Sequence, residues 1–346
     1  MKYQTPLTNK TVEIIPEGGE ERIIFAIETS CDETAAAVVR NGREVLSNVV
    51  ASQIDIHQKY GGVVPEVAAR QHLESIVPVI EEAAEKANIN IKTDVDAFAG
   101  TVGPGLVGAL LVGLNAVKTL SMVHDKPFIG VNHLNAHVCA NYLDNDFEPP
   151  FICMLVSGGH TQLIKVASYG EQEILGETLD DAVGEAYDKT ARLIGLPYPG
   201  GPHLDKLAKE GDKNRFTFTK AKVGEYDFSF SGLKTAVLRV TQQFTKEELP
   251  VKDLAASFQE TVSEILIQKT LKAANDFGIK KIALAGGVAA NSEIRRKFFA
   301  QRENGFEVMA PEFKYCTDNA AMISSAAYFQ SNTIQNLDVE VFSRVK

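Results

Sequence analysis

The sequence has few of the features that mark secreted and membrane proteins. Its four cysteines are scattered with no C-x-x-C pair, which argues against a zinc knuckle and predicts reduced thiols. The longest uncharged apolar run, residues 102–114, is glycine-rich and shorter than the about 20 residues of a membrane span. Residues 1–22 lack the apolar core of a signal peptide. We expect a cytoplasmic protein without a membrane span, whose residues 1–22 form a disordered or loosely attached tail with a break at 16–19.

Positive charge is also scarce. The 45 acidic side chains outnumber the 35 basic ones and give a net charge of −10, which argues against a protein that coats nucleic acid. Residues 206–222 are a local exception with six basic and two acidic side chains, and residues 295–297 form a smaller basic cluster. Such runs are usually solvated surface, but they can also form a local basic face.

Several common catalytic motifs are missing. Neither G-x-x-x-x-G-K-[ST] nor G-x-G-x-x-G occurs, so the P-loop and the Rossmann fingerprint are excluded. No glutamate follows His133, so the H-E-x-x-H signature of zinc proteases and its general base are absent.

The chain does contain one succession of elements twice. A buried apolar run at 23–27 opens a strand–turn–strand–turn–strand pattern, and the same order returns from residue 151. In each half a long helix and an apolar strand follow, and that strand ends in a glycine-rich turn. Strands that alternate with helices predict an α/β fold, here of two duplicated lobes with a ligand cleft between them.

The predicted lobes follow from this repeat. We expect an N-terminal lobe of residues 23–132 plus 320–346 and a C-terminal lobe of residues 133–319. Residues 177–250 have no counterpart in the first half and are predicted to be an insertion.

Two histidines have the spacing of metal ligands. His133 and His137 share one face if the segment is helical. Asp318 precedes a small-residue helix, and with the two histidines it would complete a set that suits Fe(II) and that zinc also tolerates. Two unrelated helical histidines and an aspartate that only caps its helix remain the alternatives.

The glycine-rich turns suggest a phosphate site. Ser157, Gly158 and Gly159 separate two predicted strands, and glycine lets backbone N–H groups approach a phosphate closely. Residues 286–291 and 103–105 form two more glycine-rich turns, and three such turns at matching places favour a nucleotide cleft. Asp188 and Asp205 in the insertion could accept hydrogen bonds from ribose hydroxyls, although a solvated acidic helix and a turn explain them equally well.

Together these segments resemble one family, the tRNA N6-adenosine threonylcarbamoyltransferases, called TsaD in bacteria and Kae or Qri in other lineages. The matches run in order through the chain from residue 23. They are residues 27–34, 60–66, 103–106, 133–137, 156–162, 188–189, 198–202, 228–235, 285–291 and 316–319. Residues 1–22 depart from the family pattern.

The resemblance implies a fold, a metal and a substrate site. The fold is the duplicated, actin-like and sugar-kinase-like (ASKHA) α/β fold. One divalent metal, Fe(II) before Zn(II), would be bound by His133, His137 and Asp318. The nucleotide part of the substrate would contact Leu155, Val156, Ser157, Gly158, Gly159, Asp188, Gly201, Asp205 and Asn291.

The resemblance also implies a reaction. The threonylcarbamoyl group of threonylcarbamoyl-adenylate passes to N6 of the adenosine next to the anticodon, in tRNAs that read codons starting with A, and AMP leaves. Asp32 and Glu33 are candidates for the proton acceptor by position alone. The implied partners are tRNA, the related chain TsaB and the ATPase TsaE, with a homodimer as a further possibility. An ATPase or kinase on the same fold, a metallopeptidase and a non-enzymatic scaffold are the competing interpretations.

Overall fold

A computed structural model describes residues 1–15, 19–330 and 337–344. The chain divides into two units, each with a hydrophobic core of its own. The first unit comprises Met1–Phe147, Tyr169–Glu171 and Thr317–Lys346, and the second comprises Glu148–Ser168 and Gln172–Cys316.

The first unit contains most of the N-terminal elements and one C-terminal helix. Its strands are β1 (Lys2–Gln4), β2 (Thr11–Glu13), β3 (Ile23–Glu28), β4 (Glu33–Arg40), β5 (Glu44–Ser52), β6 (Ala97–Gly103) and β7 (Phe128–Asn132). Its helices are α1 (Ile54–Gln58), α2 (Pro65–Ala87), α3 (Ile91–Asp94), α4 (Val107–His124), α5 (His133–Cys139), the 3-10 helix η1 (Ala140–Tyr142) and α12 (Ala320–Phe329).

The second unit contains the remaining elements. Its strands are β8 (Phe151–Val156), β9 (Thr161–Ser168), β10 (Glu171–Glu177), β11 (Lys281–Ala285) and β12 (Glu307–Met309). Its helices are α6 (Val183–Leu193), α7 (Gly200–Ala208), α8 (Ser231–Thr241), α9 (Val251–Asp276), α10 (Ser292–Phe299) and α11 (Phe313–Cys316), with 3-10 helices η2 (Gly287–Ala290) and η3 (Ala300–Asn304).

The two five-stranded sheets have the same strand order. The first runs β5-β4-β3-β6-β7 and the second runs β10-β9-β8-β11-β12. In each sheet the central strand pairs antiparallel with the strand that follows it and parallel with the strand that comes after a long helix. This repetition confirms the duplicated α/β fold predicted from the sequence.

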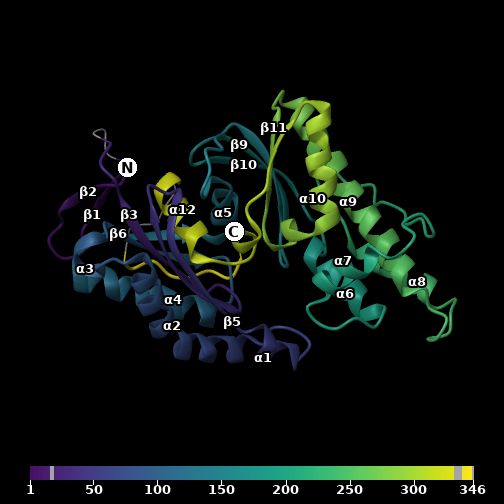
Figure 1. Cartoon of the computed structure of the whole chain (residues 1–346), viewed down its shortest axis with the longest axis horizontal. Coiled ribbons are helices and arrows are strands. Elements are labelled where there is room, and N and C mark those ends of the chain that lie inside the picture. The colour runs from purple at the N-terminus through teal and green to yellow at the C-terminus, as the bar shows by residue number, and fades with distance from the viewer. Residues whose placement is uncertain (16–18, 331–336, 345–346) are drawn as a thin grey trace. The chain divides into compact units, whose positions relative to one another are not determined.

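Helices cover both faces of the first sheet (Figure 1). Helices α2 and α4 contact one face, where Phe25, Ile27 and Val38 form a common core with them. Helix α12 contacts β3 to β7 and is held to β3 by the Ser324 hydroxyl, which donates to the Ile24 carbonyl at 3.1 Å. Every residue of β6 is buried, as expected for a parallel strand that is covered on both faces.

Helix α4 is long and apolar enough, by length and composition, to cross a membrane, and it is the one such helix in the described part of the chain. Its Ala109, Leu110, Leu114 and Val117 are buried, and it contacts β3, β6 and α2. Core helices commonly have this composition, so α4 is weak evidence for a membrane span.

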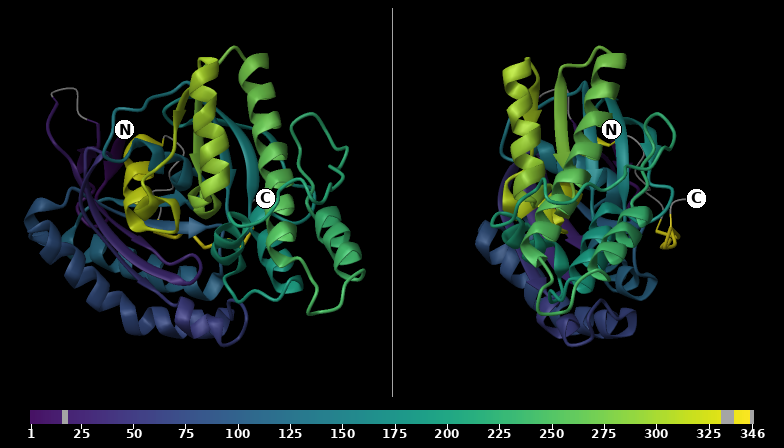
Figure 2. Two further views of the ribbon diagram at one scale, coloured as in Figure 1. Left: turned by 45° about the vertical axis from the view of Figure 1, so that its right-hand side comes forward. Right: turned by 90° about the vertical axis from the view of Figure 1, so that its right-hand side faces the viewer.

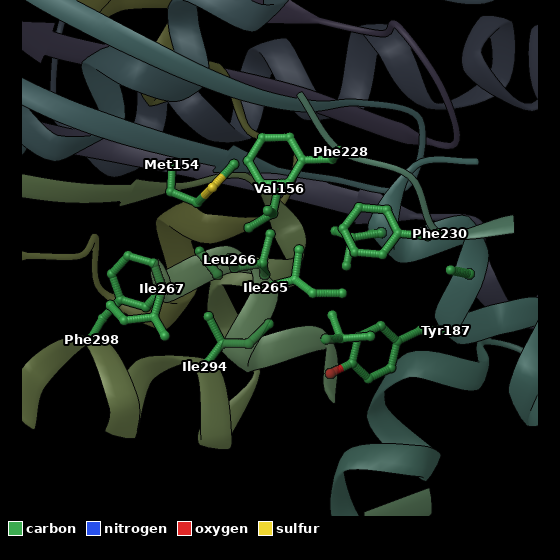
Figure 3. Close-up of a cluster of buried hydrophobic side chains, with 14 of the residues drawn as sticks. Met154, Val156, Tyr187, Phe228, Phe230, Ile265, Leu266, Ile267, Ile294 and Phe298 are labelled. Atoms are coloured by element: carbon green, nitrogen blue, oxygen red, sulfur yellow. The ribbon is translucent and has the colours of Figure 1, made fainter. Parts of the chain in front are cut away.

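The core of the second unit lies between the sheet and helices α6, α9 and α10 (Figure 3). Met154 and Val156 of β8 contribute to it together with Leu266 of α9 and Ile294 of α10. The predicted insertion, residues 177–250, supplies α6, α7 and α8 to this unit, and two of its aromatic residues, Phe228 and Phe230, are fully buried in the same core. The insertion is therefore part of the folded core.

The division of the chain differs from the predicted boundaries. Residues 133–147 and 317–319 group with the first unit, although we placed them in the C-terminal lobe. The reason is that α5 follows β7 directly and packs against α12. All three predicted metal ligands therefore belong to one unit.

The N-terminal segment is a hairpin, which corrects the prediction of a disordered or loosely attached tail. Strands β1 and β2 pair antiparallel, and Tyr3 and Ile14 are buried. Asp125, which ends α4 in a left-handed conformation, accepts hydrogen bonds from the backbone N–H groups of Leu7 and Thr8 at 2.9 and 3.2 Å. Residues 16–18 of the predicted break lie outside the described residues.

We predict that Asp125 attaches this hairpin. Asp125→Gly keeps the left-handed backbone free of strain but removes the acceptor, so trypsin should cleave after Lys10 several-fold faster. Asn88→Gly is the matched control, because Asn88 ends α2 in the same conformation at φ 52°. Equal cleavage rates in the two variants would show that Asp125 does not hold the hairpin.

Candidate functional site

Helix α5 places the two predicted histidine ligands side by side. The Asn132 side chain caps the helix by accepting from the N–H groups of Leu134 and Asn135 at 2.9 and 3.2 Å, which fixes the first turn directly after β7. The rings of His133 and His137 lie one turn apart, with their centroids separated by 4.6 Å. Both side chains are buried.

Asp318 completes the group. Its Oδ1 lies 3.2 Å from Nε2 of His137 and 3.5 Å from Nε2 of His133. One ligand atom from each of the three residues lies within 4.8 Å of the others, a spacing that can hold a metal ion. Asn319, not Asp318, caps α12 by accepting from the N–H of Met322 at 3.1 Å. The alternative in which Asp318 serves only as a cap is therefore excluded.

The state of His137 fits a metal ligand. Both of its ring nitrogens are buried and neither makes a hydrogen bond to another described residue, although Nε2 is at ion-pair distance from Asp318. Burial lowers the pKa of His137 below its ordinary value, so the imidazole is neutral at pH 7. A neutral imidazole nitrogen with no hydrogen-bond partner is the form that coordinates a metal.

Glu28 orients His133, and sequence reasoning assigned it no role. This carboxylate at the end of β3 is fully buried and lies 3.1 Å from Nδ1 of His133, on the opposite side of the ring from Asp318. It also accepts from the Thr101 hydroxyl and the Ser30 N–H. A carboxylate behind a histidine fixes the ring and its tautomer. The sequence does contain one sign of this role, because Glu28 is an acidic residue at the end of the apolar strand β3.

Negative charge accumulates around this group. Burial disfavours a charged His133, but the Asp318 and Glu28 carboxylates outweigh it and raise the pKa of His133 to about 9. Burial, followed by the charges of Asp318 and Asp32, raises the pKa of Glu33 far above its ordinary value. A cation placed between the histidines and Asp318 would offset this repulsion. Two nitrogen donors and one carboxylate suit Fe(II) or Zn(II).

In the second unit, two predicted glycine-rich turns leave the same edge of the sheet. Strands β8 and β11 run parallel, with Leu155 opposite Ala285, so the turns that follow them are adjacent. Gly286 has φ 87°, and a Cβ there would lie 2.4 Å from the Val156 carbonyl oxygen, so this close approach requires glycine. Gly158 and Gly159 face open space, where a Cβ would meet no atom within 4 Å.

Asp188 holds another turn of the second unit, at Gly200 and Gly201. Its Oδ1 accepts from the N–H groups of Gly200 and Gly201 at 2.8 and 3.2 Å. Burial nevertheless raises the pKa of Asp188 above its ordinary value. The structure thus joins Asp188 and Gly201, two of the predicted substrate residues, through one hydrogen bond.

Asp205 and Asn291 meet through a residue that the sequence did not single out. Asp205 Oδ1 accepts from Nε2 of Gln259 at 3.0 Å, and Gln259 Oε1 accepts from Nδ2 of Asn291 at 2.9 Å. Asp205 also accepts from the Ser292 hydroxyl and N–H at 2.8 and 3.2 Å. Both carboxylate oxygens of Asp205 are therefore already bonded within the protein.

Much of the predicted basic face is neutralised. Lys213 pairs with Glu260 at 3.2 Å, Arg215 with Asp253 at 2.6 Å and Lys220 with Glu264 at 2.8 Å. In the smaller cluster, Arg296 pairs with Glu293 and Lys297 with Glu260. Lys206 and Lys222 are exposed, and the positive charge of Lys206 acts on the nearby Glu210.

Comparison with known proteins identifies the family. A sequence model described as TsaD, tRNA N6-adenosine threonylcarbamoyltransferase, matches residues 44–325. The chain belongs to the TsaD family. A tRNA N6-adenosine threonylcarbamoyltransferase of Clostridium perfringens is 55% identical over 317 residues, covering 90% of this chain and 93% of that protein. One from Gloeothece citriformis is 53% identical over 335 residues, covering 93% and 96%.

Solved structures with low sequence identity show the fold alone. The T. kodakarensis HypF structure gives a TM-score of 0.63 at 15% identity and covers 94% of this chain and 48% of that chain. Component A of the (R)-2-hydroxyglutaryl-CoA dehydratase of Acidaminococcus fermentans gives 0.51 at 15% identity, covering 90% and 97%. These similarities agree with the predicted ASKHA-type fold.

Membership in the TsaD family establishes the class of activity. The chain is a transferase that modifies tRNA. TsaD enzymes are metal-dependent, which agrees with the group formed by His133, His137 and Asp318.

We predict that Glu28 supports metal binding without touching the metal. Glu28→Gln should weaken metal affinity by about 10- to 100-fold, because the ring of His133 loses its carboxylate partner. Metal content after competition with a chelator measures the effect, and thermal unfolding checks that the variant folds. Glu44→Gln, an exposed position on β5 of the same unit, is the control. Equal metal retention in the two variants would contradict this role.

Proposed function

We propose that the chain transfers the threonylcarbamoyl group from threonylcarbamoyl-adenylate to N6 of the adenosine next to the anticodon. The substrates are tRNAs that read codons starting with A, and AMP is released. The observation that carries this proposal is the group of His133, His137 and Asp318, with both histidines buried, in a chain of the TsaD family. The metal would be Fe(II), with Zn(II) as the alternative, and the protein would work in the cytoplasm.

The second unit is suited to hold the adenylate. Backbone N–H groups of Gly158 and Gly159 would donate to its phosphate, because a Cβ at either residue would meet no atom within 4 Å. The Ser157 N–H already donates to the His160 carbonyl at 2.9 Å and closes this turn. Leu155 and Val156 lead into that turn at the end of β8. Asp188, Gly201, Asp205 and Asn291 would contact the nucleoside, and the bonds described above hold each of them in place.

The transfer forms a carbon–nitrogen bond, breaks a carbon–oxygen bond and passes one proton from N6 to an acceptor. The N6 amine attacks the carbamoyl carbon, the bond from that carbon to the phosphate oxygen breaks, and AMP leaves while N6 loses a proton. A divalent metal held by His133, His137 and Asp318 would supply Lewis-acid stabilisation of the developing charge. An exocyclic adenine amine is a poor nucleophile, so positioning of the two substrates should contribute much of the rate.

Asp32 and Glu33 are the two candidates for the proton acceptor by position. Asp32 directly precedes β4 and Glu33 begins it. Glu33 interacts electrostatically with Asp318 of the metal group.

We infer that protein partners bind the first unit. Helices α2 and α4 contact each other, and they expose the apolar side chains of Leu73 and Val77 on α2 and of Val107 and Leu111 on α4. Exposed apolar side chains on adjoining helices suit a partner-binding surface. A chain of related fold, TsaB, would cover this surface, and a second copy of the present chain is the alternative. The ATPase TsaE completes the set that family membership implies.

A transfer assay tests the proposed function. The protein is mixed with unmodified tRNA, threonylcarbamoyl-adenylate and Fe(II) or Zn(II), with and without TsaB and TsaE, and digested tRNA is analysed by mass spectrometry. Wild type should form threonylcarbamoyladenosine, and His133→Ala should lose both the product and the bound metal. His124→Ala, on α4 and outside the metal group, should retain both.

The outcomes separate the competing functions. If folded, metal-loaded wild type yields no product under any of these conditions, the proposal is wrong. ATP hydrolysis by the same preparation would then favour an ATPase or kinase. Neither product nor hydrolysis would favour a scaffold.

A second prediction concerns the tRNA. Lys206→Glu combined with Lys222→Glu should weaken tRNA binding and flatten its salt dependence by about two units of slope, because these two cations are exposed and can meet phosphates. The control is Lys2→Glu combined with Lys10→Glu, which changes the net charge by the same amount at the hairpin of the first unit. It should weaken tRNA binding less. If both double variants weaken tRNA binding equally, only the net charge matters. Residues 206–222 are then not a tRNA-binding surface.

A further inference from the structure

A buried glutamine joins the side chains that we assign to the nucleoside. Gln259 lies on α9 and is 4% exposed. It bonds to Asp205 on α7 and to Asn291 at the start of α10, so one amide connects three helices. Figure 2 shows α9 and α10 running side by side, which allows this short connection.

The orientation of the Gln259 amide is fixed by its partners. An ionised carboxylate only accepts hydrogen bonds, so the NH₂ group of Gln259 must face Asp205. The carbonyl oxygen of Gln259 then faces Asn291, whose own NH₂ group must point toward it. The Asn291 oxygen is left to accept from the N–H groups of Glu293 and Ile294 at 3.1 and 3.0 Å. The charge on Asp205 thus sets the direction of two successive amides.

The same amide borders a cavity and a core tyrosine. Gln259 lines a cavity of about 320 Å³ together with Ser292, Glu293 and Arg296, whereas Asp205 and Asn291 are not part of its lining. The Tyr187 hydroxyl lies 3.4 Å from Gln259 Oε1, and its ring lies at the edge of the hydrophobic core (Figure 3). Tyr187 directly precedes Asp188, which links the network to the Gly200–Gly201 turn.

We propose that Gln259 is a positioning residue for the nucleotide part of the substrate. It holds Asn291 and Asp205 in the orientation in which they meet the nucleoside. The reason is that a buried amide with both ends bonded tolerates only one arrangement of its partners. The inference rests on the proposed function, because that function brings a nucleotide to these residues.

Replacement of the amide by a thioether tests the proposal. Gln259→Met keeps the length of the side chain but makes neither hydrogen bond. We expect the dissociation constant of AMP to rise about tenfold, and the KM for threonylcarbamoyl-adenylate to rise with it while kcat changes less. Gln268→Met is the matched control on the same helix, because Gln268 is exposed and accepts a hydrogen bond from the surface residue Lys220 at 3.3 Å. It should bind AMP like wild type.

A charge exchange provides a second and independent test. Gln259→Glu places a carboxylate against Asp205 and should weaken AMP binding further. Combining it with Asp205→Asn restores one donor and one acceptor at this contact, so part of the lost affinity should return. A merely structural role of Gln259 would not produce recovery from a second substitution in the site. Metal content should stay unchanged in every variant, since the metal group lies in the other unit.

The possible results distinguish this inference from the function on which it rests. If wild type binds AMP and folded Gln259→Met binds it equally well, the positioning role is wrong and the proposed function stands. If wild type binds no AMP, the nucleotide assignment itself fails and the inference falls with it. If Gln259→Met does not fold, as thermal unfolding would show, the absence of recovery in the exchanged pair overturns the inference.

Discussion

Parallel pairing of the central strands is the constraint on which the rest of the structure depends. Strands β3, β6 and β7 run in the same direction, so the residues at their carboxyl ends meet at one edge of the sheet. Glu28 ends β3, Thr101 lies near the end of β6, and His133 follows β7. Glu28 therefore contacts both Thr101 and His133, although the three residues are distant in sequence. Strand direction places Glu28 beside His133, and Asp318, which precedes α12, completes the candidate metal centre.

The second sheet uses the same constraint for a different purpose. Strands β8 and β11 are parallel, and their carboxyl ends carry the two glycine-rich turns. At this edge the side chains are small, and Gly286 lies so close to Val156 that no side chain fits. The carboxyl ends of the strands in the first sheet therefore carry charged side chains, whereas those in the second sheet carry accessible backbone. The first arrangement suits a metal, and the second suits a phosphate.

Burial of polar groups explains why these sites are rigid. Glu28, His133 and Gln259 are all buried, and each has hydrogen-bond partners on more than one element. A buried polar group that loses its partner is costly, so such networks resist rearrangement. His137 differs, because its buried ring nitrogens have no hydrogen-bond partner among the described residues. Among the metal-ligand candidates, His133 is therefore oriented by Glu28, whereas no described residue takes that place behind the ring of His137.

The sequence by itself determined the repeat, the α/β class and the three metal-ligand candidates. Apolar periodicity and glycine turns are local signals, and the i, i+4 spacing of His133 and His137 is a local property of a helix. Family resemblance supplied the activity and the substrate residues. Only the tertiary structure revealed Glu28 and Gln259, the pairing of Lys213 with Glu260 and the assignment of α5 to the first unit. The physical reason is that a buried polar contact depends on which strand or helix lies opposite, and no local pattern encodes that neighbour.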